Sequence, residues 1–179
     1  MFCPSCGKEM KKIRKDYHYA ESGLKNVILG DLTVYTCSCG EEMPLIPHLE
    51  QLHRVIAVEL IKSKSLLSGD AVRFLRKQLG MKAVELSRVL GVSKTTVSRW
   101  ENGDENIGPA NDRLLKSLVV RKVEEEMEGY IKLSVLEEIF AAIPQKHPSR
   151  HFSITIPVDK LADYDYGLDF CRDHQPSLA

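Results

Sequence analysis

The stretch that decides the fold reads LGMKAVELSRVLGVSKTTVSRWENG and covers residues 79–103. Its pattern predicts a short helix over about 82–90 and a second over about 93–103, joined by a tight turn at Gly91. Ser93 is a good N-cap for the second helix. The apolar positions 86, 89, 92, 97 and 100 can then converge into one small core, Trp100 included. These features together predict a helix-turn-helix.

The outward side of the second helix carries small, basic and amide-bearing side chains. These types suit the major groove of duplex DNA. The candidate DNA-binding residues are Ser93, Lys94, Thr95, Ser98, Arg99 and Asn102. Arg99 could reach a guanine with two hydrogen bonds, whereas Lys94 is better suited to a phosphate near the helix N-terminus. Further phosphate contacts are expected from Arg73, Arg76, Lys77 and Arg88.

The distribution of charge supports a polyanion-binding surface in the middle of the chain. The net charge of the whole chain is zero, yet residues 70–122 hold 11 Lys and Arg against 6 Asp and Glu. Residues 123–143 are acidic, with 1 Lys against 6 Glu. A basic region beside an acidic one suggests two surfaces with different partners. The alternative is an ordinary helical bundle with a solvated basic face.

Two cysteine pairs upstream predict a zinc module. Cys3 and Cys6 are separated by two residues, and Cys37 and Cys39 by one. In a reducing compartment such pairs are more often metal ligands than disulfides. Four thiolates would make a closed, structural zinc site, because catalysis needs an open position on the metal. Two alternatives remain open: a redox dithiol at the first pair, or a histidine in place of one cysteine, with His18, His48 and His53 as candidates.

The rest of the module and the segments around the helix-turn-helix have weaker patterns. Two β-prone runs at 26–29 and 32–35 flank a possible turn at Gly30-Asp31. A helix from 48 to about 64 is expected to connect the modules, with Leu49, Leu52, Ile56 and Leu60 on one face. A longer helix should begin at Pro109, with a buried stripe of Leu114, Leu115, Leu118, Val119, Val123 and Met127.

The last fifty residues predict one helix and one strand. A capping-box pattern at Ser134 precedes an apolar face that ends at Pro144. Residues 152–158 alternate in polarity, and Pro157 would place that strand at a sheet edge. The strand could add to a partner's sheet or pack within a dimer of this chain. Cys171 is expected to be an inert thiol.

Several classes of protein are disfavoured by the sequence. No stretch of 18 apolar residues exists, and the first residues do not resemble a signal peptide, so we expect a cytoplasmic protein. We find no nucleophile motif, phosphate-binding loop or open metal site, and therefore expect no enzymatic activity.

Residues 72–118 resemble the Xre/Cro-like helix-turn-helix family, through Gly91-Val92-Ser93 and the run from Val97 to Gly103. That family usually has Thr-Gln where this chain has Lys82-Ala83. The resemblance implies a five-helix domain that binds DNA as a dimer. We therefore expect a mainly α protein with a small β zinc module: a zinc-knuckle domain (1–46), a linker helix (47–67), a helix-turn-helix domain (68–128) and a short α+β C-terminal extension (129–179).

The order of the modules over residues 1–122 resembles the MqsA/YgiT-type antitoxin family. It starts with Cys3-Pro4-Ser5-Cys6-Gly7, continues with a second cysteine pair and a linker, and ends with the helix-turn-helix. The resemblance implies a zinc module that neutralises a toxin, often an mRNA interferase, and a homodimer that represses its own operon at a palindrome. In that family an Arg and an Asn read bases; the Arg corresponds to Arg99 and the Asn position to Thr95.

Two functions follow from these patterns. The first is an antitoxin that is also a DNA-binding repressor. The second is a stand-alone zinc-containing transcriptional regulator without a toxin partner. A neighbouring reading frame that is toxic alone, and whose product co-purifies with this chain, would discriminate between them.

Overall fold

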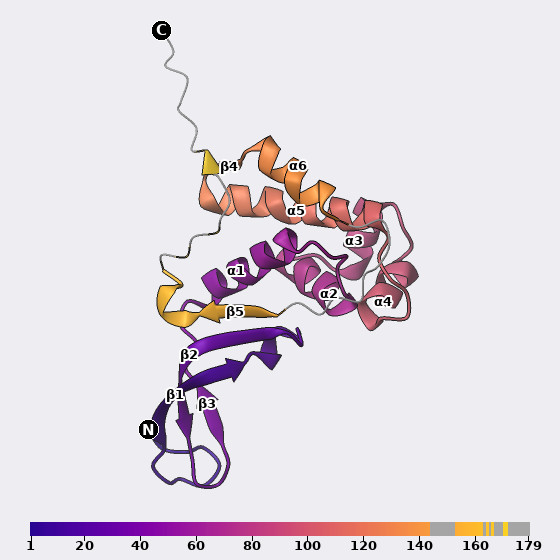
Figure 1. Cartoon of the computed structure of the whole chain (residues 1–179). Coiled ribbons are helices and arrows are strands. Elements are labelled where there is room, and N and C mark those ends of the chain that lie inside the picture. The colour runs from indigo at the N-terminus through magenta and orange to yellow at the C-terminus, as the bar shows by residue number, and fades with distance from the viewer. Residues whose placement is uncertain (144–152, 163, 165, 167–169, 172–179) are drawn as a thin grey trace. The chain divides into compact units, whose positions relative to one another are not determined.

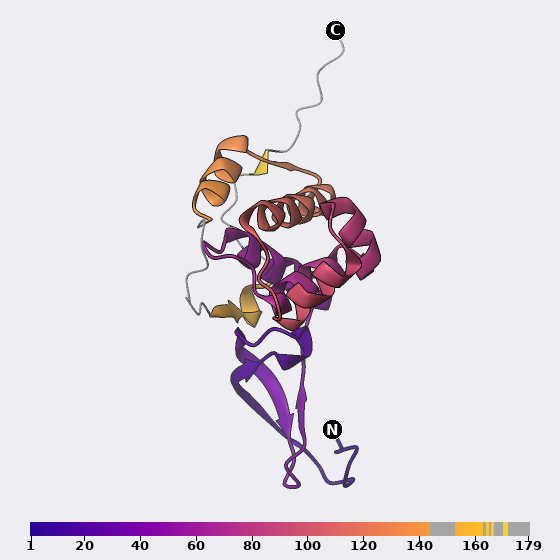
Figure 2. The same ribbon diagram turned by 90° about the vertical axis from the view of Figure 1, so that its right-hand side faces the viewer.

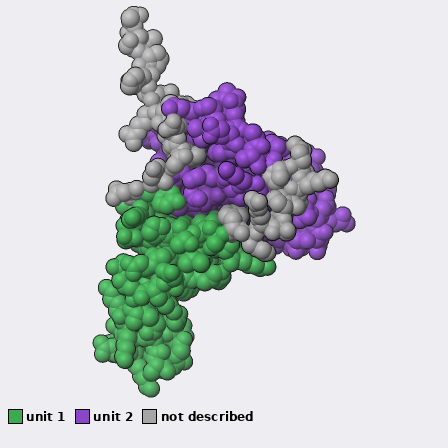
Figure 3. Space-filling view, in the orientation of Figure 1, with its two compact units in different colours: residues 1–53, 151–164 green, residues 54–150, 165–179 purple. Residues whose placement is uncertain are grey.

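The computed structural model describes residues 1–143, 153–162, 164, 166 and 170–171 (Figure 1). The chain forms two compact units (Figure 3). Unit 1 contains residues 1–53 and 151–164, and unit 2 contains residues 54–150 and 165–179. The predicted architecture, mainly helical with a small β module at the cysteines, is confirmed.

Unit 1 is built on one sheet with a long central strand. β1 (Lys11–His18) and β3 (Glu42–Pro44) pair antiparallel with β2 (Val27–Thr36), and β5 (Ile154–Pro157) pairs parallel with it. Two short 3-10 helices, η1 (Ala20–Ser22) and η2 (Val158–Lys160), complete the unit. The β1–β2 hairpin is long and twisted in both views (Figures 1 and 2). Its buried face carries Val27, Leu29, Leu32 and Val34.

The turn predicted at Gly30-Asp31 is wrong, because β2 runs through these residues without interruption. Asp31 has a positive φ of 53°, and the pairing with β1 shifts register between Lys15 and Tyr17. Asp16 stabilises this irregularity, since its carboxylate accepts a hydrogen bond from the Asp31 N–H at 3.1 Å. Gly30-Asp31 is therefore a bulge inside one strand.

Most of unit 2 is helical. Its helices are α2 (Gly69–Gln78), α3 (Ala83–Leu90), α4 (Lys94–Asn102), α5 (Pro109–Met127) and α6 (Leu133–Ala141), and α1 (Leu49–Lys62) supplies residues from 54 onward. Two short strands, β4 (Tyr130–Ile131) and β6 (Phe170–Cys171), pair antiparallel. The core of the helix-turn-helix includes Leu75, Leu86, Val97, Trp100 and Leu115.

Four predictions about individual side chains and ends need correction. Val89, Leu114 and Leu49 are 46%, 41% and 49% exposed. In α3 the buried face consists of Leu86, Ser87 and Leu90, which turns Val89 outward. The helix expected to have Ser134 as its N-cap begins two residues earlier, with Lys132 as its N-cap.

A buried ion pair fixes the segment between α1 and α2 to α5. Lys116 and Asp112 have no exposed side-chain surface, and their charged atoms lie 3.2 Å apart. Lys116 Nζ donates to the carbonyls of Ser63 and Ser65, each at 3.2 Å, while Asp112 accepts from the Leu67 N–H at 2.8 Å. Burial lowers the pKa of Lys116, and the charge of Asp112 opposes that shift. Asp112 and Lys116, which are four residues apart in α5, therefore form an ion pair inside the core and hold the segment before α2 against α5.

The strand predicted over 152–158 is present as β5, although residues up to 152 lie outside the described part. It pairs with β2 of its own chain, and its use in a partner's sheet or in a dimer stays a prediction. The side chain of Cys171 also lies outside the described part.

Candidate metal centre and nucleic-acid interface

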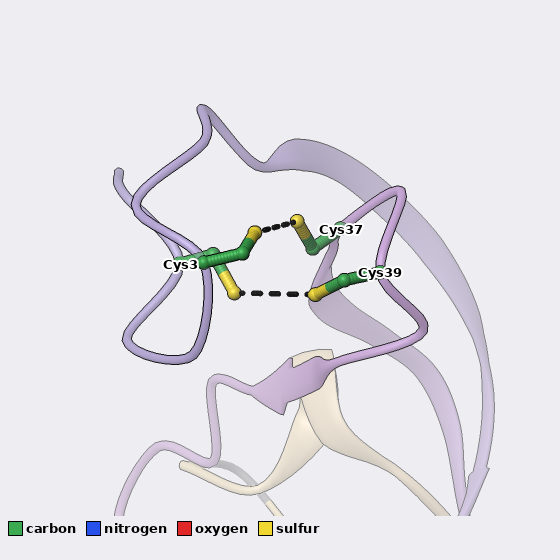
Figure 4. A group of neighbouring side chains, drawn as sticks. Cys3, Cys37 and Cys39 are labelled. Carbon is green, nitrogen blue, oxygen red and sulfur yellow. Dashed lines mark hydrogen bonds between the residues drawn. The ribbon is translucent and has the colours of Figure 1, made fainter.

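The four predicted cysteines form one cluster at the end of the β1–β2 hairpin. Cys3 Sγ lies 3.6 Å from Cys39 Sγ, Cys6 Sγ lies 3.4 Å from Cys37 Sγ, and all four sulfurs lie within 4.8 Å of one another. These distances are far longer than a disulfide bond and bracket the edge of about 3.8 Å in a tetrahedron with Zn–S near 2.3 Å. Figure 4 shows sulfurs of two facing loops turned toward each other.

Each cysteine pair sits in a tight loop that a glycine makes possible. Gly7 and Gly40 have positive φ values of 70° and 94°, which favour glycine. The Gly7 N–H donates to the Cys3 carbonyl at 2.9 Å, and the Gly40 N–H to the Cys37 carbonyl at 3.0 Å. The turn at Gly40 therefore brings Cys37 and Cys39 to one side despite their one-residue spacing.

The surroundings of Cys37 favour a metal-binding thiolate. The backbone N–H of Cys39 hydrogen-bonds to the Cys37 sulfur and lowers the pKa of Cys37 to about 6. The pKa of its neighbour Cys6 is raised to about 12, because the hydrogen bonds that Cys6 shares with the other thiols outweigh the backbone N–H of Lys8. A thiolate is the form that ligates metals. The cluster can hold one metal ion with four sulfur ligands, and zinc is consistent with that donor set.

The three histidines considered as ligands for this site are not part of the cysteine group. His18 Nε2 is within hydrogen-bond distance of the Lys25 carbonyl at 2.9 Å, and His53 Nε2 of the Tyr19 hydroxyl at 2.9 Å. His48 is exposed, and the metal-ligand group among the described residues consists of the four cysteines alone.

The outer face of α4 brings the six predicted DNA-binding residues together on exposed surface. The exposed residues are Ser93, Lys94, Thr95, Ser98, Arg99 and Asn102. The Ser93 hydroxyl accepts from the Thr96 N–H at 3.0 Å, and so it caps α4 as predicted. Gly91, with a φ of 66°, makes the turn between α3 and α4. Val97 and Trp100 point into the core, so the helix presents its polar side outward.

Arg76 does not belong to the exposed basic surface, which corrects the phosphate-contact prediction for it. Arg76 Nε and Nη2 donate to the Glu101 carboxylate at 2.5 and 3.0 Å, and Nη1 donates to the Met81 carbonyl at 2.8 Å. The Arg76 side chain is 14% exposed and that of Glu101 is 9% exposed. Hydrogen bonding to Glu101 raises the pKa of Arg76.

Arg73 also forms hydrogen bonds with the end of α4. Its Nη2 donates to the Glu101 carbonyl at 2.7 Å and to the Asn102 side-chain oxygen at 3.0 Å. Lys77 and Arg88 are exposed, as a phosphate contact requires. Sequence reasoning missed the role of Glu101. An acidic residue on a helix predicted to face a polyanion is unusual, and that was the available signal.

Comparison with known proteins adds one finding. A family model described as the antitoxin component of bacterial toxin-antitoxin systems, MqsA, matches residues 1–127. The chain belongs to the MqsA antitoxin family. The matched residues include both the cysteine cluster and the whole of α4, whereas α6 and β5 lie beyond them. No curated protein and no solved structure matches the chain.

Within the part of the chain that the structure describes, no helix combines the length and apolar character needed to cross a membrane.

Proposed function

We propose that this MqsA-family protein acts in the cytoplasm as an antitoxin that neutralises a partner toxin and, as a homodimer, represses its own operon at a palindromic site. Membership of the family supports the antitoxin role. The exposed polar face of α4, on a helix-turn-helix that is otherwise well packed, is the observation that carries DNA binding. Such domains usually read two half-sites as dimers.

The proposed contacts divide by chemistry. Thr95 in the first turn of α4 and Arg99 one turn further on face outward and are the proposed base readers, with Arg99 paired to a guanine. Ser93 and Lys94 stand at the N-terminus of α4, where free N–H groups favour a phosphate. Because Arg73 occupies the Asn102 side-chain oxygen, the Asn102 amide group is left as a donor.

The cysteine cluster is proposed to hold one structural zinc ion per chain, on Cys3, Cys6, Cys37 and Cys39. Zinc bound there would tie the N-terminal loop to the end of the β1–β2 hairpin. Four thiolate ligands leave no position for water, which supports a role without catalysis. We therefore propose that the protein binds its partners and has no enzymatic activity.

The test is DNase footprinting on the DNA upstream of the gene, with and without the product of the neighbouring gene. We expect protection of two symmetric half-sites. Arg99→Ala should weaken binding to that site by about 1–3 kcal/mol and abolish discrimination at one base pair. The matched control is Arg121→Ala, because Arg121 is an exposed α5 arginine in a surface ion pair. Equal footprints for the Arg99→Ala and Arg121→Ala chains would refute the proposed readout.

Stable co-purification of the chain with a toxic neighbouring product would establish the antitoxin function. Specific DNA binding without any such product would instead indicate a stand-alone regulator.

A further inference from the structure

The chain passes between its two compact units three times. It leaves unit 1 after residue 53, returns to it at residue 151 and leaves it again after residue 164. The first passage lies within α1, and residues 1–127, which match the family, contain this passage and neither of the others. The C-terminal extension therefore adds two connections between the units.

In unit 1 the extension is anchored by β5 and by the end of η2. Ile154 and Ile156 of β5 are 4% and 0% exposed, and their strand pairs with β2. Gln51, in the first turn of α1, donates from its side-chain amide to the Leu161 carbonyl and, at 3.4 Å, to the Ala162 carbonyl. Because Leu161 is also buried, this part of the extension belongs to the core of unit 1.

In unit 2 the extension is anchored at Tyr166 and by β6. Lys62, the last residue of α1, donates from Nζ to the Tyr166 carbonyl at 3.2 Å. Tyr166 is buried, and Arg54 of the same helix donates a hydrogen bond to its side chain. Further along the chain, Phe170 and Cys171 of β6 pair with β4. The extension is therefore bound to α1 before residue 53, through Gln51, and after it, through Arg54 and Lys62.

The chain between the two anchors is short. Gln51 and Lys62 are eleven residues apart on α1, which corresponds to a rise of about 16 Å. Leu161 and Tyr166 are five residues apart, and five residues of fully extended chain span at most about 18 Å. If α1 unwound, its residues would lengthen from about 1.5 Å to about 3.3 Å each. The segment 161–166 cannot follow such a lengthening while it stays bound at both ends.

We propose that residues 161–166 are an intramolecular tether that holds α1 helical across the junction of the two units and so limits the motion of the cysteine module relative to the helix-turn-helix. Fraying α1 near residue 53, or bending it away from the tether, moves the anchors apart and must break the contacts at one of them. The contacts at both ends therefore stabilise the helix where it enters unit 2. This proposal concerns the chain's own extension and does not depend on what either module binds.

The experiment is hydrogen–deuterium exchange of the α1 backbone in the full chain, followed by mass spectrometry. The variant has Gly-Ser-Gly-Ser-Gly-Ser inserted after Ala162, which keeps every anchor and lengthens the connection from 162 to 166 about 2.5-fold. The effective concentration of tethered groups falls with about the −3/2 power of the tether length, so α1 amides near residue 53 should exchange about fourfold faster than in wild type. The matched control has the same insertion after Cys171, beyond the second anchor, and should exchange like wild type.

A second variant removes one anchor without changing the length of the chain. Lys62→Met keeps the aliphatic part of the side chain and loses the donor to Tyr166, and α1 should exchange about tenfold faster. Its control is Glu59→Gln, which breaks the ion pair of Lys62 at 2.9 Å but leaves that donor in place. The Co2+ absorption spectrum of the cysteine cluster and the fluorescence of Trp100 report whether units 1 and 2 remain folded.

The rotational correlation times of the two units, from 15N relaxation, test the limited motion directly. We expect amides of β1 and α4 to report one correlation time in wild type and two in the chain with the insertion after Ala162. Two correlation times already in wild type would overturn the proposal. Equal exchange of α1 in the two insertion chains would also overturn it, and if the insertion after Ala162 unfolds either unit, equal exchange of Lys62→Met and Glu59→Gln decides in the same way.

Discussion

Glu101 gives the sharpest test of how α4, the proposed DNA-reading helix, is held in place. Glu101→Gln keeps the size of the side chain and removes its charge, which leaves the Arg76 guanidinium half-buried without a counter-ion. Breaking a buried ion pair by neutralising one partner costs about 3–5 kcal/mol. Arg76 is 14% exposed and keeps its bond to the Met81 carbonyl, so we expect a smaller loss of unfolding free energy, about 2–3 kcal/mol.

The assay is urea denaturation followed by the fluorescence of Trp100, the only tryptophan of the chain and the neighbour of Glu101. The matched control is Glu125→Gln, which breaks an ion pair whose two side chains are each 62% exposed and should cost no more than about 0.5 kcal/mol. A second control, Arg76→Met/Glu101→Leu, removes both charges and should recover part of the loss. The reasoning fails if Glu101→Gln and Glu125→Gln unfold at the same urea concentration.

Three further predictions concern the metal, a close contact and pH. Cys39→Ser should abolish stoichiometric zinc binding in a colorimetric chelator titration and the tetrahedral Co2+ spectrum, while Cys171→Ser should keep one zinc per chain; an unchanged zinc content of Cys39→Ser would exclude the four-cysteine site. Gly69→Ala should lower the unfolding free energy by about 1–3 kcal/mol, because its Cβ would overlap the Trp100 carbonyl. A Cβ at Gly108 meets open space, so Gly108→Ala should change the unfolding free energy by no more than about 0.5 kcal/mol. Equal urea midpoints for the two variants would contradict this prediction. Burial lowers the pKa of His53, so the stability that the neutral imidazole contributes is fully present above the ordinary histidine pKa and is lost as pH falls below about 6.5. Wild type should therefore lose more unfolding free energy than His53→Gln between about pH 7.5 and 5.5. Parallel losses in the two proteins would refute this prediction.

The parts of the fold that could be predicted from sequence are those set by local chemistry. Ser93 caps α4 and Gly91 ends α3 because their conformational preferences act within a few residues, and both are confirmed. The cysteine ligands could be predicted because the loop geometry at Gly7 and Gly40 follows from the same short motifs. The DNA-binding assignments on α4 remain predictions, although all six side chains are exposed.

The parts that could not be predicted depend on pairings between distant residues. The alternation over residues 152–158 indicates a strand but contains nothing that identifies β2 as its neighbour, which lies more than a hundred residues away. The charge of Arg76 alone suggests a phosphate contact, and only the packing of α2 against α4 reveals that Glu101 neutralises it. The spacing of Asp112 and Lys116 fits an exposed helix pair equally well, and burial distinguishes the two cases.

Arg73 connects the stability of unit 2 to its proposed DNA surface. One guanidinium group binds the Glu101 carbonyl, lies 3.5 Å from the Glu101 carboxylate and orients the Asn102 amide, while 39% of the side chain stays exposed. The interior of the domain thus determines which way the last polar group of α4 faces. A change at Glu101 should therefore reach the DNA surface through Arg73 and Asn102, even though Glu101 itself is too deeply buried to touch a base. Hydrogen bonds of Arg73 connect the proposed DNA-binding surface to the buried ion pair behind it. Stability and DNA recognition should therefore respond together to substitutions at Arg73, Arg76 and Glu101.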